Sequence, residues 1–417
     1  MTRSADVDVI VVGAGAAGIA AGARLKAAGV SALTLEAKDR VGGRSHTLPF
    51  AAGEGLDLGC GWLHSADRNP WTGHAERLGF AVDRSPAAWT RPSLAADFPA
   101  EAQADYQKVF LAFERRLERA ARGRQDRPAS SLIRAHEARW APLLNAFSNY
   151  YNGAPLREIS VKDYAAYQPT DENWRVRQGY GALIAAYAAD LSIRLSTPVR
   201  RIEHGGGGLR LVTDAGALTA RAVIVAVSTT VLAEGELVFD PPLPAKRDAA
   251  AALPLGHVEK VYLKLLQPEA FPVETLVHGR TDTDATGAYT LRPLGLAVIE
   301  GFFGGDLAAD LEMGKGGAFA AFAADELAAV LGSDIRRQMA PIAESTWRTD
   351  PFIRGAYSHA VVGRSDARAE LAAAVDDRLF FAGEACSPHA FSTAHGAYET
   401  GELAAEAALA ALGVQAT

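Results

Sequence analysis

Three glycines and one acid near the start of the chain have the spacing of a dinucleotide-binding site. Gly13, Gly15 and Gly18 form the pattern Gly-x-Gly-x-x-Gly, and Glu36 follows at the end of the next apolar run. The first glycine permits a tight turn, the second lets the backbone approach a pyrophosphate, and the third lets a helix pack closely on a strand. Glu36 can accept hydrogen bonds from the diol of an unphosphorylated ribose. These residues predict that the chain binds NAD or FAD.

A second glycine pair follows Glu36 directly. The stretch EAKDRVGGRSHT carries Arg40, Gly43 and Arg44. A glycine pair lets the backbone pass close to an extended cofactor, and an arginine can neutralise the charge of a pyrophosphate. The alternative interpretation is a surface turn with two solvated arginines.

The elements that must position these residues form a β-α-β unit. We expect a strand at 7–12, an alanine-rich helix to about residue 28 and a second strand at 31–37. Strands that alternate with helices predict an α/β fold with a parallel sheet covered by helices. Further elements are expected downstream: buried strands at 221–229 and 377–385, and a long helix at 394–412.

The stretches between these elements have a different pattern. Residues 71–189 read as mostly helical and polar, residues 255–341 alternate like an antiparallel sheet with an appended helix, and four glycines at 205–208 predict a hairpin turn. A chain of 417 residues exceeds one hydrophobic core, so we expect two interleaved domains, α+β overall. The expected cofactor domain comprises residues 1–70, 190–254 and 342–417, and the expected substrate domain comprises residues 71–189 and 255–341.

The composition is that of an ordinary globular protein, with 49% hydrophobic and 22% charged residues. The net charge of −7 excludes a globally basic nucleic-acid binder. Cys60 and Cys386 lack the spacing of a disulfide framework or a metal site, so we expect a reducing compartment, the cytoplasm, and no metal. A strand that begins by Val7 leaves no room for a cleavable leader, and no apolar run approaches the length that crosses a bilayer. The sequence leaves the oligomeric state undetermined.

Seven stretches in order along the chain resemble the flavin-dependent amine oxidase family, which includes monoamine oxidases, polyamine oxidases and histone lysine demethylases. They are GAGAAGIAAGARL with EAKDRVGGRSHT, DLGCGWLHSADRNP, RQGYGAL, VIVAVSTTVL, PLGHVEKVYLKL, WRTDPFIRGAYS and FFAGEACSPHAFSTAHGAYETGELAA. The resemblance implies FAD in a Rossmann-like domain and oxidation of an amine C–N bond to an imine by hydride transfer to flavin N5. O2 would reoxidise the flavin and give H2O2, and the imine would hydrolyse to an aldehyde and an amine or ammonia.

Lys260, in PLGHVEKVYLKL, matches the family's lysine that holds a water beside flavin N5. In an alternating strand Lys260 shares a face with Val258, Tyr262 and Lys264. From this pattern alone, an exposed lysine that protects a sheet edge is the plainer interpretation. The retained spacing of the motif favours the functional interpretation, and Lys264 is expected at the surface.

The resemblance also implies an aromatic cage for the substrate nitrogen. Tyr357 matches one wall, where a ring face orients the amine and excludes water, although a core tyrosine is the alternative. The family's second cage tyrosine falls on Thr393, with Phe391 two residues earlier, so the cage is halved or is rebuilt by Phe391. Ala356 stands where monoamine oxidases have the cysteine that bonds the flavin, which implies noncovalent FAD.

A histidine favours the polyamine-oxidising branch of the family. His64, in a Trp-x-His sequence followed by Asn-Pro, is implied to lie in the substrate groove, although a lone histidine is more often packed or exposed. Glu384 is implied to contact the ribityl or pyrophosphate region, and Val199, alternatively a core strand residue, to contact the adenine. Together, the cofactor-binding residues expected are Gly13, Gly15, Gly18, Glu36, Ala37, Arg40, Gly43, Arg44, Gly59, Trp62, Val199, Trp347, Gly383, Glu384 and Thr393.

These features predict an FAD-dependent amine oxidase whose partners are a small amine, favoured as a polyamine, and O2. Asp171, Glu172 and Glu259 are weak candidates for carboxylates along a polycation tunnel. The alternatives are a monoamine or cyclic-amine oxidase, an L-amino-acid oxidase that binds the substrate carboxylate through Arg175 or Arg177, and a redox-silent FAD-stabilised binding protein. The retained lysine and tyrosine argue against the last, because a scaffold does not need them.

Overall fold

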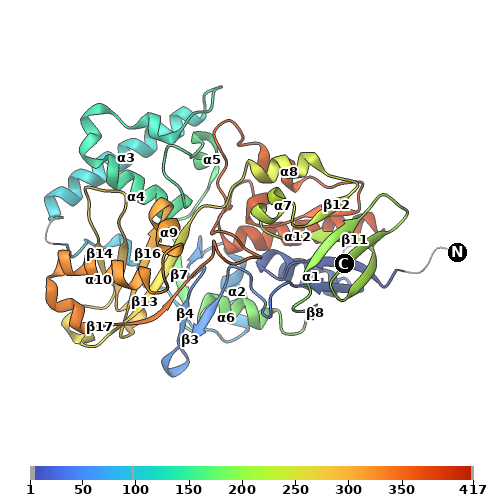
Figure 1. Ribbon diagram of the computed structural model, residues 1–417, viewed down its shortest axis with the longest axis horizontal. Helices are drawn as coiled ribbons and strands as arrows, with labels where there is room; N and C mark the ends of the chain where they lie inside the picture. Colours follow the sequence, from blue (N-terminus) through green and yellow to red (C-terminus); the bar gives the residue numbers. More distant parts are fainter. Residues whose placement is uncertain (1–4, 96–97, 415–417) are drawn as a thin grey trace.

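The computed structural model describes residues 5–95 and 98–414, and two main sheets organise them (Figure 1). Residues 1–4 and 415–417 of the expected cofactor domain and residues 96–97 of the expected substrate domain lie outside the described residues. The mixed α/β architecture expected from the sequence is confirmed. No helix in the described ranges is long and apolar enough to cross a bilayer.

The larger sheet has eight strands and contains the β-α-β unit. Its order is β12, β9, β10, β11, β1, β2 and β8, and β18 also pairs with β11. β1 runs parallel to both β2 and β11, and β18 runs parallel to β11, as expected. The strands are β1 Val7–Val12, β2 Ala32–Leu35, β8 Ile193–Arg194, β9 Val199–Glu203, β10 Leu209–Thr213, β11 Gly216–Val225, β12 Val238–Asp240 and β18 Leu379–Phe381.

One side of the larger sheet contains antiparallel pairs beside the parallel strands. β10 runs antiparallel to β9 and to β11. The four glycines at 205–208 lie in the short loop between β9 and β10, which confirms the predicted hairpin turn. The physical reason is the length of the connections, because a parallel crossover needs a dozen or more residues whereas a hairpin needs only a few.

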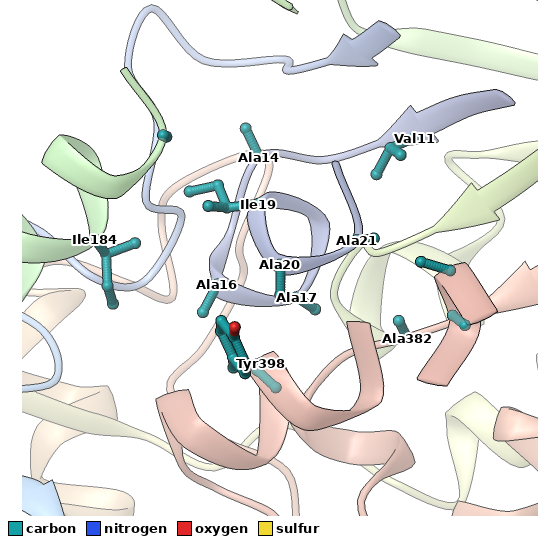
Figure 2. Close-up of a cluster of buried hydrophobic side chains, with 14 of the residues drawn as sticks. Val11, Ala14, Ala16, Ala17, Ile19, Ala20, Ala21, Ile184, Ala382 and Tyr398 are labelled. Atoms are coloured by element: carbon teal, nitrogen blue, oxygen red, sulfur yellow. The ribbon is translucent and has the colours of Figure 1, made fainter. Parts of the chain in front are cut away.

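Helices α1 (Ala16–Ala27) and α12 (Ala394–Ala411) pack closely against each other. Figure 2 shows Ala16, Ala17 and Ala20 of α1 facing α12 and its Tyr398. The approach depends on Gly401, because a Cβ atom there would lie 2.1 Å from the carbonyl oxygen of Ala17. This contact fixes α1, and with it the glycine turn, against the rest of the core.

The smaller sheet has five antiparallel strands in the order β14, β15, β16, β13 and β17. This confirms the antiparallel sheet expected for residues 255–341, and β13 lies in its interior. Its strands are β13 Val258–Leu265, β14 Thr275–His278, β15 Ala288–Leu291, β16 Val298–Gly304 and β17 Met339–Glu344, and the helices that follow β16 are α9 Gly305–Glu312 and α10 Ala318–Leu331.

Residues 71–189 are largely helical, as expected, but two short strands in this stretch were not predicted. Strand β7 (Asn173–Val176) pairs with β5 (Leu63–His64) and β6 (Val82–Asp83), and so joins His64 to Asn173. The helices here are α2 Pro70–Arg77, α3 Ala100–Ala121, α4 Ala141–Asn152, α5 Val161–Ala166 and α6 Tyr180–Tyr187. The remaining strands and α-helices are β3 Thr47–Pro49, β4 Gly55–Asp57, α7 Thr229–Glu234, α8 Pro244–Ala251 and α11 Ala367–Ala372.

The division into two interleaved domains stays a prediction. The positions of the strands can be compared with the expected boundaries of the two domains. Every strand of the eight-stranded sheet falls within residues 1–70, 190–254 and 342–417, and β13 to β16 fall within 255–341. Strand β17 spans the expected boundary at 341/342, because its pairing with β13 continues past that point.

Candidate active site

The glycine turn between β1 and α1 leaves the first peptide groups of α1 open. A Cβ atom on Gly13, whose φ is +100°, would lie 2.7 Å from the Ala226 carbonyl oxygen, and one on Gly18 would lie 1.8 Å from the Gly13 oxygen. The protein itself therefore needs both glycines. A Cβ atom on Gly15 would meet no atom within 4 Å, and Gly15 supplies no side-chain cap to α1. Uncapped N–H groups at a helix start suit an anion such as a pyrophosphate.

Glu36 follows β2 and lies beside this turn. Its carboxylate accepts hydrogen bonds from two backbone N–H groups, at 2.6 and 2.9 Å. Burial raises the pKa of Glu36, and the two hydrogen bonds oppose that shift. The Thr197 N–H donates to the Glu36 carbonyl oxygen at 2.8 Å, which brings the start of β9 close. Half-buried Ala37 and Val199, both predicted to contact the cofactor, therefore belong to the same region.

The second glycine pair lies directly over the first turn. The Gly42 N–H donates to the Ala14 carbonyl oxygen at 2.8 Å, and a Cβ atom on Gly43 would lie 3.3 Å from Gly15 Cα. Half-buried Arg40 donates to the Gly43 carbonyl oxygen at 2.9 Å. The structure thus brings together the two glycine motifs that the sequence places about thirty residues apart.

Arg44 and Glu384 form an ion pair that links the two ends of the chain. Arg44 Nη1 lies 3.0 Å from Glu384 Oε1 and also donates to the carbonyl oxygen of Ala356. Glu384 accepts further hydrogen bonds from Ser358 Oγ at 2.7 Å and the Ser392 N–H at 2.9 Å. Burial alone would raise the pKa of Glu384, but nearby guanidinium charges and these hydrogen bonds lower it. Glu384 is therefore ionised, and the alternative of a surface turn with solvated arginines is wrong.

A small cavity of about 10 Å³ lies beside this ion pair. Its lining joins Gly383 and Glu384 to Ser228 and Thr229 at the start of α7. A Cβ atom on Gly383, whose φ is +143°, would meet no atom within 4 Å. Thr229 Oγ1 is buried and has no hydrogen-bond partner in the described part of the chain. Neither hydroxyl residue was predicted as a site residue, although both lie in the stretch VIVAVSTTVL that resembles the family.

Lys260 is buried in an interior strand. Its exposed fraction is 6%, and Nζ donates to the Asp57 carbonyl oxygen at 3.0 Å and forms an ion pair of 3.0 Å with Glu300 of β16. The alternative of an exposed lysine that protects a sheet edge is therefore wrong, whereas Lys264 is exposed as expected. Glu300 was not predicted from the sequence, although a lone acid within an apolar strand is a signal that could have indicated it.

A second cavity, of about 30 Å³, lies beside Lys260. Trp62 lines it, and the Trp62 ring has two close neighbours: Trp89, with ring centres 4.3 Å apart, and the guanidinium of Arg175, 4.5 Å from the ring centre. Trp89 remains 48% exposed. The cavity lining includes Asp57, Gly61, Trp62, Arg175, Lys260, Tyr262, Leu294 and Glu300.

His64 lies in β5, two residues after Trp62. Its Nδ1 is 2.6 Å from Asn173 Oδ1, and its ring centre is 6.4 Å from that of Trp89. Burial lowers the pKa of His64, and the charge of Lys260 adds to that shift. The structure therefore brings a neutral imidazole to the neighbourhood of Lys260, while its place in a substrate groove stays a prediction.

The residues predicted for an aromatic cage are held by different contacts. Half-buried Tyr357 donates its hydroxyl hydrogen to the carbonyl oxygen of Tyr150. Phe391 is buried, with the Arg368 guanidinium 3.8 Å from its ring centre and the Tyr167 ring centre at 5.5 Å. One face of Phe391 is thus already covered, and the neighbouring ring, Tyr167, was not predicted.

Thr393 begins α12 as its N-cap residue. Its Oγ accepts a hydrogen bond from the Gly396 N–H at 3.0 Å and donates to the Ala390 carbonyl oxygen at 2.6 Å. The Thr393 hydroxyl therefore donates one hydrogen bond and accepts another within the cap. The contribution of Thr393 to a ligand site is its place at the start of α12.

Trp347 and Gly59 meet beside Arg44. A Cβ atom on Gly59 would lie 1.7 Å from the Arg44 carbonyl oxygen and 3.2 Å from the Trp347 ring. The Trp347 N–H donates at 2.8 Å to Glu259, which is 1% exposed. Adjacent strand residues point to opposite faces, so Glu259 faces away from Lys260 and cannot line a substrate path on that side.

Of the other charged candidates, Arg175 lines the cavity beside Lys260, and the lining of that cavity does not include Asp171, Glu172 or Arg177. Asp171 and Glu172 are exposed loop residues. Buried Arg175 is ion-paired with Glu274, and Arg177 Nη2 lies 2.6 Å from Glu54 Oε1. In residues 5–95 and 98–414, no three His, Cys, Asp or Glu side chains are grouped to hold a metal ion.

The residues around the two glycine motifs fit a flavin dinucleotide. Gly15 and Gly383 have open space where a side chain would stand, and the start of α1 presents uncapped N–H groups. Arg44 and the unpaired hydroxyl of Thr229 lie within the same cavity lining, so both a cation and a hydrogen-bonding group are available to an anionic or hydroxylated ligand.

Sequence comparison places the chain among known proteins. A family model described as flavin-containing amine oxidoreductase matches residues 16–409. Polyamine oxidase 2 of Arabidopsis thaliana is 30% identical over 441 residues, which cover 97% of this chain and 88% of that protein. Polyamine oxidase 3 of Oryza sativa subsp. japonica is 29% identical, with 97% and 89% coverage.

Solved structures share the fold. Cyclohexylamine oxidase from Brevibacterium oxydans has a TM-score of 0.75 and 23% identity, with 98% of this chain and 100% of that chain covered. A double mutant of putrescine oxidase has the same TM-score at 18% identity, with 97% and 99% coverage. At these identities the likeness concerns the fold alone.

Proposed function

The chain belongs to the family of flavin-containing amine oxidoreductases, and on this premise we propose that it binds FAD noncovalently and oxidises a polyamine-type substrate to an imine. O2 is the proposed electron acceptor and H2O2 its product, and the imine hydrolyses to an aldehyde and an amine. The observation that carries the proposal is the position of Lys260, whose buried Nζ is held by the Asp57 carbonyl oxygen and Glu300 at the lining of a cavity that Trp62 also lines.

Different residues of the chain would hold different parts of FAD. Glu36 accepts hydrogen bonds from the adenosine ribose, and the uncapped start of α1 together with Arg44 faces the pyrophosphate. Glu384 holds Arg44 in place through their ion pair. Ala356 has no nucleophilic atom, which supports noncovalent binding. The two-domain division and a location in the cytoplasm are parts of the same proposal.

The bound flavin supplies the chemistry of accepting a hydride from the carbon beside the amine nitrogen. The protein must then receive the amine in its neutral form, because a protonated nitrogen has no lone pair to support the developing imine. Tyr357 and the Trp62 region offer aromatic surface that excludes water from the amine. Lys260 presents a fixed N–H donor at the cavity. Activity is therefore expected to rise with pH until another group titrates.

The proposed substrate class rests on two observations. Arg175 and Arg177 are both paired with carboxylates, so neither offers a free guanidinium to a substrate carboxylate, which disfavours an L-amino-acid oxidase. The two relatives described above, with 30% and 29% identity, are polyamine oxidases by name. Putrescine and cyclohexylamine oxidases share the fold, so diamines and cyclic amines belong in the test.

The test is to mix the purified flavoprotein anaerobically with single amines and follow bleaching of the oxidised flavin band. The panel is spermidine, N-acetylated polyamines, putrescine, phenylethylamine, cyclohexylamine and L-amino acids. Rapid bleaching by polyamines is expected. Selective bleaching by aromatic or cyclic amines, or by amino acids, contradicts the substrate class, and no bleaching by any amine contradicts the activity.

A matched pair of variants tests the role of Lys260. Lys260→Met is expected to keep flavin bound but slow its reduction, its reoxidation or both by at least tenfold. Lys264→Met, on the same strand but exposed, is expected to behave as wild type. Reoxidation is followed after admitting air, with H2O2 measured by a coupled peroxidase. Wild-type rates for both steps in Lys260→Met would remove Lys260 from the mechanism.

A further inference from the structure

Glu300 is an acid that the proposed mechanism does not use, although it lies against Lys260. Strands β13 and β16 are antiparallel, with Lys260 opposite Phe302 and Tyr262 opposite Glu300. Residues that pair directly across two strands share a face, so Lys260, Tyr262 and Glu300 lie on the same face of the smaller sheet. The side chain of Glu300 is 14% exposed.

The contacts around Lys260 Nζ hold it in one place. Nζ lies 3.0 Å from Glu300 Oε1 and donates to the Asp57 carbonyl oxygen, also at 3.0 Å. Tyr262 Oη lies 3.1 Å from the same Glu300 oxygen. A Cβ atom on Gly61 would lie 3.1 Å from Nζ, so the ammonium occupies space that the absence of a side chain leaves free.

The charges that face Lys260 leave Glu300 as its counterion. The Asp57 carboxylate already accepts hydrogen bonds from the N–H groups of Tyr180, at 2.8 Å, and Gly181, at 3.1 Å. The titratable or charged groups around Lys260 within the described residues are Asp57, Cys60, His64, Arg175, Tyr262 and Glu300.

Of these groups, only Glu300 both carries a negative charge and contacts the ammonium through its side chain. Burial raises the pKa of the Cys60 thiol to about 12, and burial lowers the pKa of His64, so both are neutral near pH 7. Burial alone would raise the pKa of Glu300, but the charges of Lys260 and Arg175 and its hydrogen bonds lower it.

We propose that Glu300 is a positioning residue for Lys260: it keeps the lysine charged and fixes Nζ at the Asp57 carbonyl oxygen. This inference rests on the proposed function, and it assigns Lys260 the part of a fixed cation and hydrogen-bond donor rather than a base that takes the substrate's proton. Removal of the Glu300 charge leaves a buried ammonium close to Arg175 without the carboxylate that contacts it, which favours the neutral amine, and the Asp57 carboxylate opposes this effect.

The first test measures the charge of Lys260 directly and needs no turnover. The chain has eight lysines, so lysine labelled with 13C at Cε gives few resonances, and Lys260→Met assigns the relevant one. The titration midpoint of Lys260 is expected to fall by about one to three pH units in Glu300→Gln and by less in Glu300→Asp, which keeps the charge. The Lys264 resonance is the internal control and should not move.

The second test separates positioning from substrate binding. If Glu300 positions Lys260, the pH profile of anaerobic flavin reduction in Glu300→Gln shifts with the Lys260 midpoint, and Glu300→Asp restores part of it. An equal Lys260 midpoint in wild type and Glu300→Gln overturns the proposal, whether or not the KM of Glu300→Gln is higher. If no amine bleaches the flavin, the proposed function fails while the NMR titration still decides the pairing. If Glu300→Gln does not fold, the Lys260 midpoint is compared between wild type and Glu300→Asp instead.

Discussion

Glu259 offers a stability test whose size follows from its surroundings. The side chain is 1% exposed, and burial, reinforced by the charge of Glu312, raises its pKa from 4.5 to about 9. The folded protein therefore binds a proton at Glu259 that the unfolded chain releases, over the range between those two values. Stability from this group is fully present below pH 4.5 and is lost as the pH rises toward 9.

The magnitude follows from linkage. Between the two pKa values of Glu259, one proton is bound in the folded state only, so the free energy of unfolding falls by about 1.4 kcal/mol per pH unit. It therefore falls by about 2.7 kcal/mol between pH 6 and pH 8. With about 2.1 cal/mol/K of unfolding entropy per residue, a chain of 417 residues loses about 3 °C in melting temperature. Glu259→Gln keeps hydrogen-bonding groups for both the backbone N–H of Trp347 and Ser345 Oγ, so it should remove this dependence and be more stable than wild type at pH 8.

The assay is denaturant unfolding followed by tryptophan fluorescence at pH 6, 7 and 8. The control is Glu269→Gln, because Glu269 is an exposed residue of the same region. The difference between wild type and Glu259→Gln should grow with pH, whereas Glu269→Gln should track wild type. Parallel curves for wild type and Glu259→Gln would refute the reasoning, since they would mean that Glu259 releases its proton equally in both states.

Three further predictions concern folding and cofactor retention. Gly15→Ala should leave the melting temperature of the flavin-free protein unchanged but weaken flavin binding at least tenfold. Gly18→Ala would place a Cβ atom 1.8 Å from a carbonyl oxygen, so it should impair folding itself. Melting curves and flavin titration distinguish these two effects. Lys246→Met should cost about 1–3 kcal/mol in denaturant unfolding, because three backbone carbonyl oxygens near the end of α11 lose their donor. Asp163→Ala should cost about 3–5 kcal/mol by the same measurement, since it leaves the buried guanidinium of Arg368, now 2.7 Å from Asp163, without its partner; a loss below 1 kcal/mol would contradict this.

Local sequence patterns were sufficient to predict several elements of the fold. The β-α-β unit and the long helix at the end of the described chain were predicted within a few residues, because glycine spacing and apolar periodicity are properties of short stretches. The antiparallel character of residues 255–341 followed from the same kind of signal. The family resemblance named Lys260 and Tyr357, and the structure leaves their roles as proposals.

Contacts between residues far apart in the sequence could not be predicted from local patterns and became visible in the folded chain. The ion pairs of Arg44 with Glu384 and of Lys260 with Glu300 depend on strand register and on contacts between segments far apart in the sequence. Strand position also decided that Lys260 is interior and that Glu259 faces the other side of its sheet. A local pattern indicates that side chains alternate between the two faces of a strand. The burial and the partners of each side chain depend on which strand lies beside it, and that is a property of the whole fold.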